Sequence, residues 1–147
     1  MKIHLLWQQK VDLKKKGQIH MEKNIKAILL TPKKHARILV LENSLSSFQK
    51  FVGGSIEILY PFGDPVAIIC NESGKVNRMP LNRGLRSLDG MLYDIIAGPA
   101  IIVAIDGENF TSLPECFLRK YYEIFKYPEV FVQNGPRIVG LLYDETI

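Results

Sequence analysis

The chain has 147 residues, the usual size of one domain, and 47% of them are hydrophobic, enough for one core without a stabilising metal or disulfide. The 23% of charged and 10% of aromatic residues exclude a disordered chain and a coiled coil. The formal net charge of +4 arises entirely in residues 1–23, and the rest of the chain carries 13 of the 19 basic and 13 of the 15 acidic side chains. Because that remainder is neutral, nucleic-acid binding is not expected.

Residues 1–23 form a separate lysine-rich extension in our interpretation. Any codons for Lys15-Lys16-Gly17 give a purine-rich run that resembles a bacterial ribosome-binding site, a short distance before Met21. Translation starting at Met21 is therefore one hypothesis. An amphipathic helix in the N-terminal segment is the alternative. Residues 24–147 are predicted to form a single α+β domain.

The first half of this domain predicts a hairpin, a helix and two strands. Residues 25–31 and 37–42 are rich in β-formers, with a turn at residues 32–35 between them. Asn43 is the expected N-cap of a helix over residues 44–52, which Gly53-Gly54 ends. Two strands follow, at residues 55–60 and 66–70; the second is wholly apolar and is expected in the centre of a sheet.

The second half begins with residues 75–86, which lose clear periodicity and contain Pro80, so no regular structure is predicted there. Strands are expected at 93–96 and 100–105, separated by a bend. Ser112 to Glu115 reads as a capping box that starts a helix over residues 112–126. Residues 130–133 and 137–143 predict a C-terminal hairpin or arm. The fold class is thus α+β, with a mixed, mainly antiparallel sheet and two helices.

Location and cysteine chemistry follow from what the sequence lacks. The longest apolar stretch, residues 95–105, is interrupted by Gly98-Pro99 and is shorter than the roughly 20 residues of a spanning helix. We therefore predict a cytoplasmic protein with no membrane partner. Cys70 and Cys116 form no CxxC pair, and we expect two buried thiols in a reducing compartment, with a disulfide between them as the alternative.

Motifs for catalysis, metals and cofactors are missing. The sequence has no P-loop, no Rossmann glycine motif, no nucleophile elbow and no HExxH. Its three histidines, His4, His20 and His35, all lie in the first quarter. We therefore predict no cofactor and no enzymatic activity. Acid and base chemistry by Glu57, Asp94 or Asp106 is an open alternative.

The segment from residue 75 to residue 86 is the best candidate for a ligand site. It carries four basic side chains and no acidic one. An arginine guanidinium can donate two hydrogen bonds to one phosphate group, and an asparagine side chain can form hydrogen bonds with the edge of a base or ribose. Salt bridges to Asp89 and Asp94 in a solvated loop are the alternative. Tyr60 and Tyr93, each at the end of a predicted strand, are expected to stack on a base. The predicted ligand-binding residues are therefore Tyr60, Asn71, Arg78, Asn82, Arg83, Arg86, Tyr93 and Asp94.

A string of short motifs runs through the domain: Glu42-Asn43-Ser44-Leu45, Phe48-Gln49, Val52-Gly53-Gly54, Ile56-Glu57, Tyr60-Pro61-Phe62, Asp64, Cys70-Asn71-Glu72, Gly74-Lys75, Pro80-Leu81-Asn82-Arg83 and Tyr93-Asp94-Ile95-Ile96-Ala97-Gly98. Through these motifs, residues from Ile25 to Lys126 resemble a family of small proteins that share a domain of unknown function, found mainly in phages, plasmids and other mobile elements of Gram-positive bacteria. The resemblance leaves out residues 1–23 and the tail after Pro128.

This resemblance implies an accessory protein of a mobile element inside a bacterial cell. By analogy with small phage proteins that inhibit host defence, we expect a homo-oligomer that sequesters a small phosphorylated nucleotide immune signal of the cyclic ADP-ribose type without catalysis. One alternative is an inhibitor that binds a host defence protein through a sheet edge or the terminal hairpin. A further alternative is a phosphodiesterase that cleaves the nucleotide.

Overall fold

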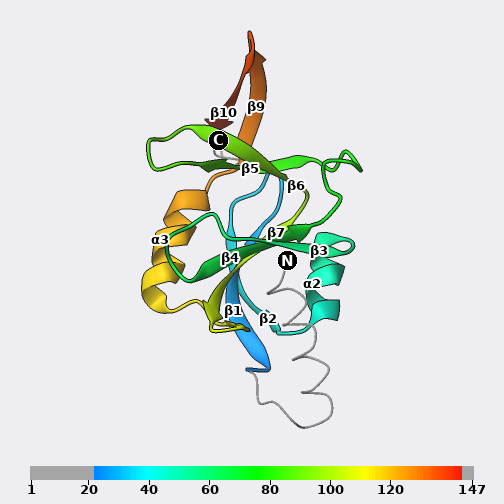
Figure 1. Ribbon diagram of the computed structural model, residues 1–147, viewed down its shortest axis with the longest axis vertical. Helices are drawn as coiled ribbons and strands as arrows, with labels where there is room; N and C mark the ends of the chain where they lie inside the picture. The colour runs from blue at the N-terminus through cyan, green and yellow to red at the C-terminus, as the bar shows by residue number, and fades with distance from the viewer. Residues whose placement is uncertain (1–21, 144–147) are drawn as a thin grey trace.

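The computed structural model describes residues 22–143 (Figure 1). Its main sheet has the strand order β2-β1-β7-β4-β3, with β8 added on β7, and every pair in it is antiparallel. Two smaller antiparallel sheets, β5-β6 and β9-β10, lie above it in the view of Figure 1. With two helices and mainly antiparallel strands, the broad α+β prediction is confirmed.

The main sheet separates two hydrophobic layers. On one face, Phe48 and Val52 of α2 pack against alternate residues such as Ile101. On the other face, Tyr121 and Phe125 of α3 and side chains of the β5-β6 hairpin pack against the intervening residues. Because successive side chains of a strand point to opposite faces, one central strand supplies both layers.

The first hairpin and the central strands follow the predictions. β1 (Asn24–Leu30) pairs with β2 (Arg37–Glu42) around the expected turn. β3 (Ile56–Leu59) pairs with β4 (Val66–Asn71), which is buried along its whole length and has a neighbour on each side. The prediction of a central strand is therefore confirmed.

Helix α2 (Leu45–Val52) ends at Gly53, whose φ of 83° suits glycine, but its start differs from the prediction. The N-cap is Ser44, whose hydroxyl accepts a hydrogen bond from the Ser47 amide at 3.1 Å. Asn43 is buried instead, and its side chain donates to the backbone oxygens of Glu22 and Phe110. It therefore joins segments far apart in the sequence rather than capping the helix.

The segment predicted to lack regular structure contains a strand. β5 (Leu81–Arg86) pairs with β6 (Leu92–Ala97), with two register shifts along the pair. Two of the residues that β5 buries are polar, Asn82 and Arg83, so the usual alternation of polar and apolar side chains is absent. That is the physical reason why the pattern gave no strand there. β7 (Ala100–Asp106) and the short β8 (Asn109–Thr111) then return the chain to the main sheet.

Helix α3 (Glu115–Phe125) begins later than predicted, and its capping box is wrong. Its N-cap is Pro114, without a side-chain cap. The Ser112 hydroxyl instead accepts from the Lys26 amide at 2.9 Å, and the Ser112 amide donates to the Glu22 carboxylate. Ser112 therefore holds the helix entrance against β1.

The C-terminal hairpin is confirmed: β9 (Glu129–Asn134) pairs with β10 (Arg137–Leu142), and Figure 1 shows the two strands extending as an arm beyond the rest of the fold.

Both cysteines are free thiols; Cys70 is buried as expected, whereas Cys116 is exposed because it lies on the solvent side of α3. Within residues 22–143 no helix has the length and apolarity to span a bilayer. The hypothesis on Met21 falls outside the described residues.

Candidate functional site

Arg83 and Asn82 are buried and bind the protein itself. The Arg83 side chain has no exposed surface and donates to the backbone oxygens of Phe125 (3.0 Å), Thr31 (3.3 Å) and Lys34 (2.7 Å), and to the Asn82 side chain (2.8 Å). Asn82 in turn donates to the oxygens of Leu30 and Gly98. These two predicted ligand residues thus tie β5 to β1 and to the end of α3, and their donors face away from any open surface.

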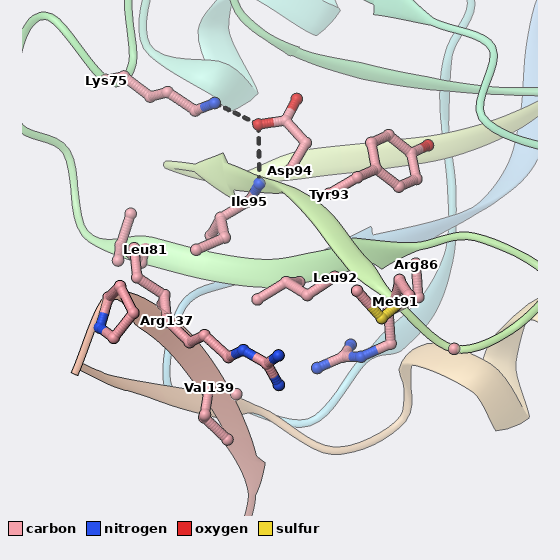
Figure 2. A pocket seen from close by; sticks show the side chains of 14 residues that line it. Lys75, Leu81, Arg86, Met91, Leu92, Tyr93, Asp94, Ile95, Arg137 and Val139 are labelled. Carbon is pink, nitrogen blue, oxygen red and sulfur yellow. Dashed lines mark hydrogen bonds and ion pairs between the residues drawn. The ribbon is translucent and has the colours of Figure 1, made fainter. Parts of the chain in front are cut away.

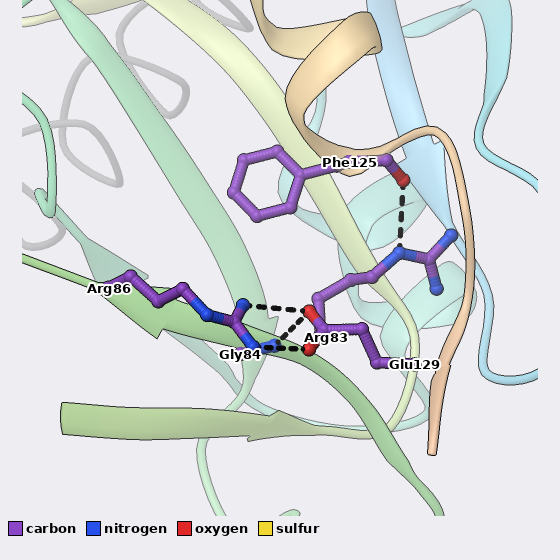
Figure 3. Close-up of polar contacts among 5 residues, drawn as sticks. All are labelled: Arg83, Gly84, Arg86, Phe125 and Glu129. Atoms are coloured by element: carbon purple, nitrogen blue, oxygen red, sulfur yellow. Dashed lines mark hydrogen bonds and ion pairs between the residues drawn. The ribbon is translucent and has the colours of Figure 1, made fainter. Parts of the chain in front are cut away.

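Arg86 leaves β5 in another direction and forms an ion pair with Glu129, the first residue of β9 (Figure 3). Its two terminal nitrogens bind the two carboxylate oxygens at 3.1 and 2.7 Å, and the Gly84 amide binds the same carboxylate at 2.9 Å. The Glu129 side chain is 3% exposed and that of Arg86 is 35% exposed. The hydrogen bonds that Arg86 donates to Glu129 raise the pKa of Arg86 above its ordinary value, so the guanidinium stays charged.

Two glycines make room for this ion pair. A Cβ atom on Gly140 of β10 would lie 2.7 Å from an Arg86 terminal nitrogen and in collision with the Glu129 carboxylate. A Cβ atom on Gly84 would lie 2.5 Å from a Leu92 methyl carbon. The close approach of the β9-β10 arm to the β5-β6 hairpin therefore depends on the absence of side chains at these positions.

A pocket of about 820 Å³, which we call the arginine pocket, lies between the β5-β6 hairpin and the arm (Figure 2). Arg86 and Tyr93 line it from the hairpin, and Arg137 lines it from the start of β10. Figure 2 shows the Arg86 and Arg137 guanidinium groups turned toward one another. Among residues 22–143, Arg86 has Glu129 as its partner, while no carboxylate pairs with Arg137.

Lys75 and Asp94 form an ion pair at another wall of the arginine pocket. The Asp94 carboxylate also accepts from the Ile95 amide at 2.8 Å, which fixes its orientation. Tyr93, the neighbouring residue on β6, is 56% exposed. The lining carries three cationic side chains and one carboxylate, but Lys75 pairs with Asp94 and Arg86 with Glu129, so the excess positive charge lies on Arg137.

The predicted residues thus divide into two groups. Arg86, Tyr93 and Asp94 meet in the arginine pocket. Tyr60, Asn71 and Arg78 line neither the arginine pocket nor the neighbouring pocket between α3 and residues 61–63, and nor do the buried Asn82 and Arg83. Asn71 has a structural task, since its amide donates to the Val52 oxygen and its carbonyl accepts from the Ser73 amide. Arg78 is exposed in a turn, with a φ of 55°.

Arg137 is the site residue that the sequence did not reveal. Its only local sign is a basic side chain directly after the Gly135-Pro136 turn of the predicted hairpin. The sequence pattern does not predict that the arm lies beside the β5-β6 hairpin. The pairing of Glu129 with Arg86 produces that contact, and it depends on two residues far apart in the sequence.

This arrangement suits the binding of an anion. Two guanidinium groups that face each other repel, and an anion between them removes the repulsion while accepting several hydrogen bonds. Phosphate fits such a site because it offers several acceptor oxygens and more than one negative charge. Within residues 22–143 no group of three or more histidine, cysteine, aspartate and glutamate side chains is arranged to hold a metal ion.

Comparison with known proteins identifies one family. No curated protein and no solved structure matches the chain. A family model described as a domain of unknown function, DUF3846, matches residues 25–126. The matched region includes Lys75, Arg86, Tyr93 and Asp94, whereas Arg137 and the arm lie beyond it. Since the match covers more than half of the chain, the protein belongs to the DUF3846 family.

Proposed function

We propose that the protein binds and sequesters a small phosphorylated ligand in the arginine pocket, without chemically changing it. The observation that carries this proposal is the convergence of Arg86 and Arg137, the second of which has no carboxylate partner among residues 22–143. The pocket is lined by charged groups, by the exposed Tyr93 and by apolar side chains of the β5-β6 hairpin and the arm, a mixture typical of a site for a small molecule.

The ligand we favour is a phosphorylated nucleotide that serves as an immune signal, such as a cyclic ADP-ribose derivative. The resemblance to proteins of phages and mobile elements leads to this part of the proposal, which would make the protein an inhibitor of host defence acting in the bacterial cytoplasm. The pocket supports it through two features, cations for phosphate and the exposed Tyr93 ring for stacking. Capture alone inhibits such a signal, so no catalytic group is required.

Isothermal titration with ADP and with 3′-cyclic ADP-ribose at low salt tests the proposal. Binding is expected for the wild type and at least ten-fold weaker binding for Arg137→Ala, because one of the two facing cations is lost. Arg119→Ala is the matched control: it removes the same charge from the exposed face of α3, outside both pockets. Chromatography of the recovered ligand should show it unaltered.

Three outcomes contradict the proposal. If neither nucleotide gives a heat of binding at concentrations up to the millimolar range, the arginine pocket does not bind a phosphorylated ligand. Equal weakening by Arg119→Ala and Arg137→Ala reduces the binding to general charge attraction. A cleaved ligand means that the protein is an enzyme, in line with the phosphodiesterase alternative.

A second candidate function, binding of a host protein, is favoured by the surface of the arm. Exposed aliphatic side chains occur on both of its strands, although a two-stranded sheet has little core of its own to stabilise it. Val130 and Leu141 are opposite one another in the register, on the same face. The exposed aliphatic residues of the arm are Val130, Val132, Ile138, Leu141 and Leu142.

Light scattering and affinity capture separate the possible uses of the arm. If it binds a copy of the same chain, the wild type is a homo-oligomer and the double variant Val130→Ser, Leu141→Ser is a monomer. If it binds a host protein, the wild type is a monomer and the double variant loses a partner that the wild type captures. A monomer without any partner leaves this candidate without support.

A further inference from the structure

A second pocket, of about 860 Å³, lies next to the arginine pocket on the other side of the β5-β6 hairpin. We call it the aromatic pocket. It is enclosed by α3, by the turn at residues 61–63 and by the segment that follows β5. Its wall contains Phe62, Tyr121 and Phe125, and its rim contains Leu88 and Ile124.

The wall of the aromatic pocket is rigid because its rings pack on each other. The Phe62 and Tyr121 ring centres are 4.5 Å apart, and those of Phe62 and Phe125 are 6.0 Å apart. Tyr121 is fixed further by a hydrogen bond of 2.6 Å from its hydroxyl to the Asp64 carboxylate. Because Tyr121 and Phe125 are themselves buried, the half-buried Phe62 offers most of the ring surface of this preformed wall, and it can bind a flat ring without much loss of side-chain entropy.

The rim of this pocket, by contrast, exposes apolar side chains to solvent. Leu88 is fully exposed, and Ile124 is exposed although it lies on a helix whose neighbouring face is buried. Exposed apolar side chains gathered around a concave site are typical of a binding site for an apolar group. The two pockets therefore differ in the groups at their walls, which are two facing guanidinium groups in the arginine pocket and packed aromatic rings in the aromatic pocket.

The two pockets are adjacent, because Arg86, Tyr93 and Gly140 line both. Arg86 forms part of the boundary, held by Glu129, and Tyr93 extends from β6 at the same place. One ligand can therefore contact both pockets if it carries an anionic group and a ring a few bonds apart. A nucleotide has this form, with a flat aromatic base as the ring, whereas a sugar phosphate or pyrophosphate lacks an aromatic ring.

We propose that the aromatic pocket is a subsite for the ring of the ligand, such as a nucleobase, whose phosphate lies between Arg86 and Arg137. This inference rests on the proposed function and adds a site that the anion-binding argument does not require. It predicts selection for the base: AMP should bind about ten-fold more tightly than ribose 5-phosphate, which has the same sugar and phosphate.

The experiment is a pair of titrations followed by two-dimensional amide NMR, which detects binding up to millimolar dissociation constants. Both ligands should shift the amide signals of Arg137 and Tyr93, and AMP alone should shift those of Leu88 and Ile124. The variant Ile124→Gln should bring AMP affinity down to that of ribose 5-phosphate and leave ribose 5-phosphate binding unchanged. Val40→Gln, an exposed aliphatic site on β2 outside both pockets, should leave both affinities unchanged.

The outcomes separate the two proposals. If ribose 5-phosphate and AMP bind equally and neither shifts Leu88 or Ile124, the ring subsite is refuted while capture of a phosphorylated ligand stands. If neither compound shifts any signal of the arginine pocket, the proposed function fails and the subsite fails with it. If the two glutamine variants have equal effects on AMP, the aromatic pocket has no special role and the inference is also refuted.

Discussion

The main sheet and the two small sheets are held in different ways. Both faces of β1, β7 and β4 are covered by aliphatic and aromatic side chains, and the central strand β4 is buried throughout. The small sheets attach through polar groups as well: beside the buried Leu85 and Ile96, Arg83 joins the β5-β6 hairpin to the turn after β1 and to the end of α3, and Glu129 joins the arm to β5. Burial thus stabilises the first region, whereas directional bonds add to burial in the second, where both pockets lie.

The variant Arg83→Ala should have the largest effect on stability. It removes a buried cation and leaves the backbone oxygens of Thr31, Lys34 and Phe125 without this donor. We expect a loss of about 4 kcal/mol in the free energy of unfolding, measured by urea denaturation. Arg119→Ala, which removes an exposed arginine, should change it by less than about 0.5 kcal/mol. Similar values for the two variants would mean that Arg83 does not hold the hairpin.

The variant Glu129→Ala should have the next largest effect and should act mainly on the arm. It leaves the Arg86 guanidinium and the Gly84 amide without their shared acceptor. We expect a loss of about 2–3 kcal/mol, together with faster hydrogen exchange in residues 129–142 than in β4. Uniform acceleration across the molecule would contradict the view that this ion pair docks the arm specifically.

A smaller effect is expected from acid, at the contact between α3 and the turn before β4. Hydrogen bonds from Lys120 and then Tyr121 lower the pKa of Asp64 below 3.8. Since the folded-state pKa is the lower one, this contact stabilises the fold above about pH 4, and its contribution is lost as the pH falls through the lowered value. The difference in urea midpoint between wild type and Asp64→Asn should therefore be present at pH 7 and shrink toward pH 2. A difference independent of pH would contradict the assignment.

The smallest expected effect concerns the two cysteines, whose reactivity compares a buried thiol with an exposed one. Desolvation, followed by the nearby Glu57 charge, raises the pKa of the Cys70 thiol to about 12, whereas Cys116 is exposed. Iodoacetamide at pH 8 should modify one thiol of the folded protein and two after unfolding in urea. Mass spectrometry should locate the first label on Cys116. Fast labelling of Cys70 in the folded state would show that this face of the sheet is open.

Apart from the short β8, the strands of the main sheet could be predicted from the sequence because each has a simple pattern. β4 is a continuous apolar run, and β1 and β2 flank a clear turn. The helix limits failed locally, since Ser44 and Asn43 are equally good caps by type and only the tertiary contact of Asn43 with Phe110 decides between them. Sequence periodicity reports burial against an apolar core, and it does so reliably in this region.

The candidate site could be predicted only in part. The sequence indicates the basic segment around β5, which contributes Lys75 and Arg86 to the arginine pocket. It does not distinguish a buried arginine from one that lines a pocket, so the pattern treats Arg83 and Arg86 alike. Arg137 was missed because its position depends on how the arm docks. The pockets themselves lie between elements far apart in the sequence, and contacts between such elements leave no periodic signal in it.

A crystal structure of the full chain with ADP tests the central claim most directly, because the claim concerns where the phosphate lies. We expect phosphate oxygens within hydrogen-bond distance of both Arg86 and Arg137, with Tyr93 against the rest of the ligand. A bound nucleotide elsewhere on the surface, with the two guanidinium groups still facing each other across an empty pocket, would contradict it.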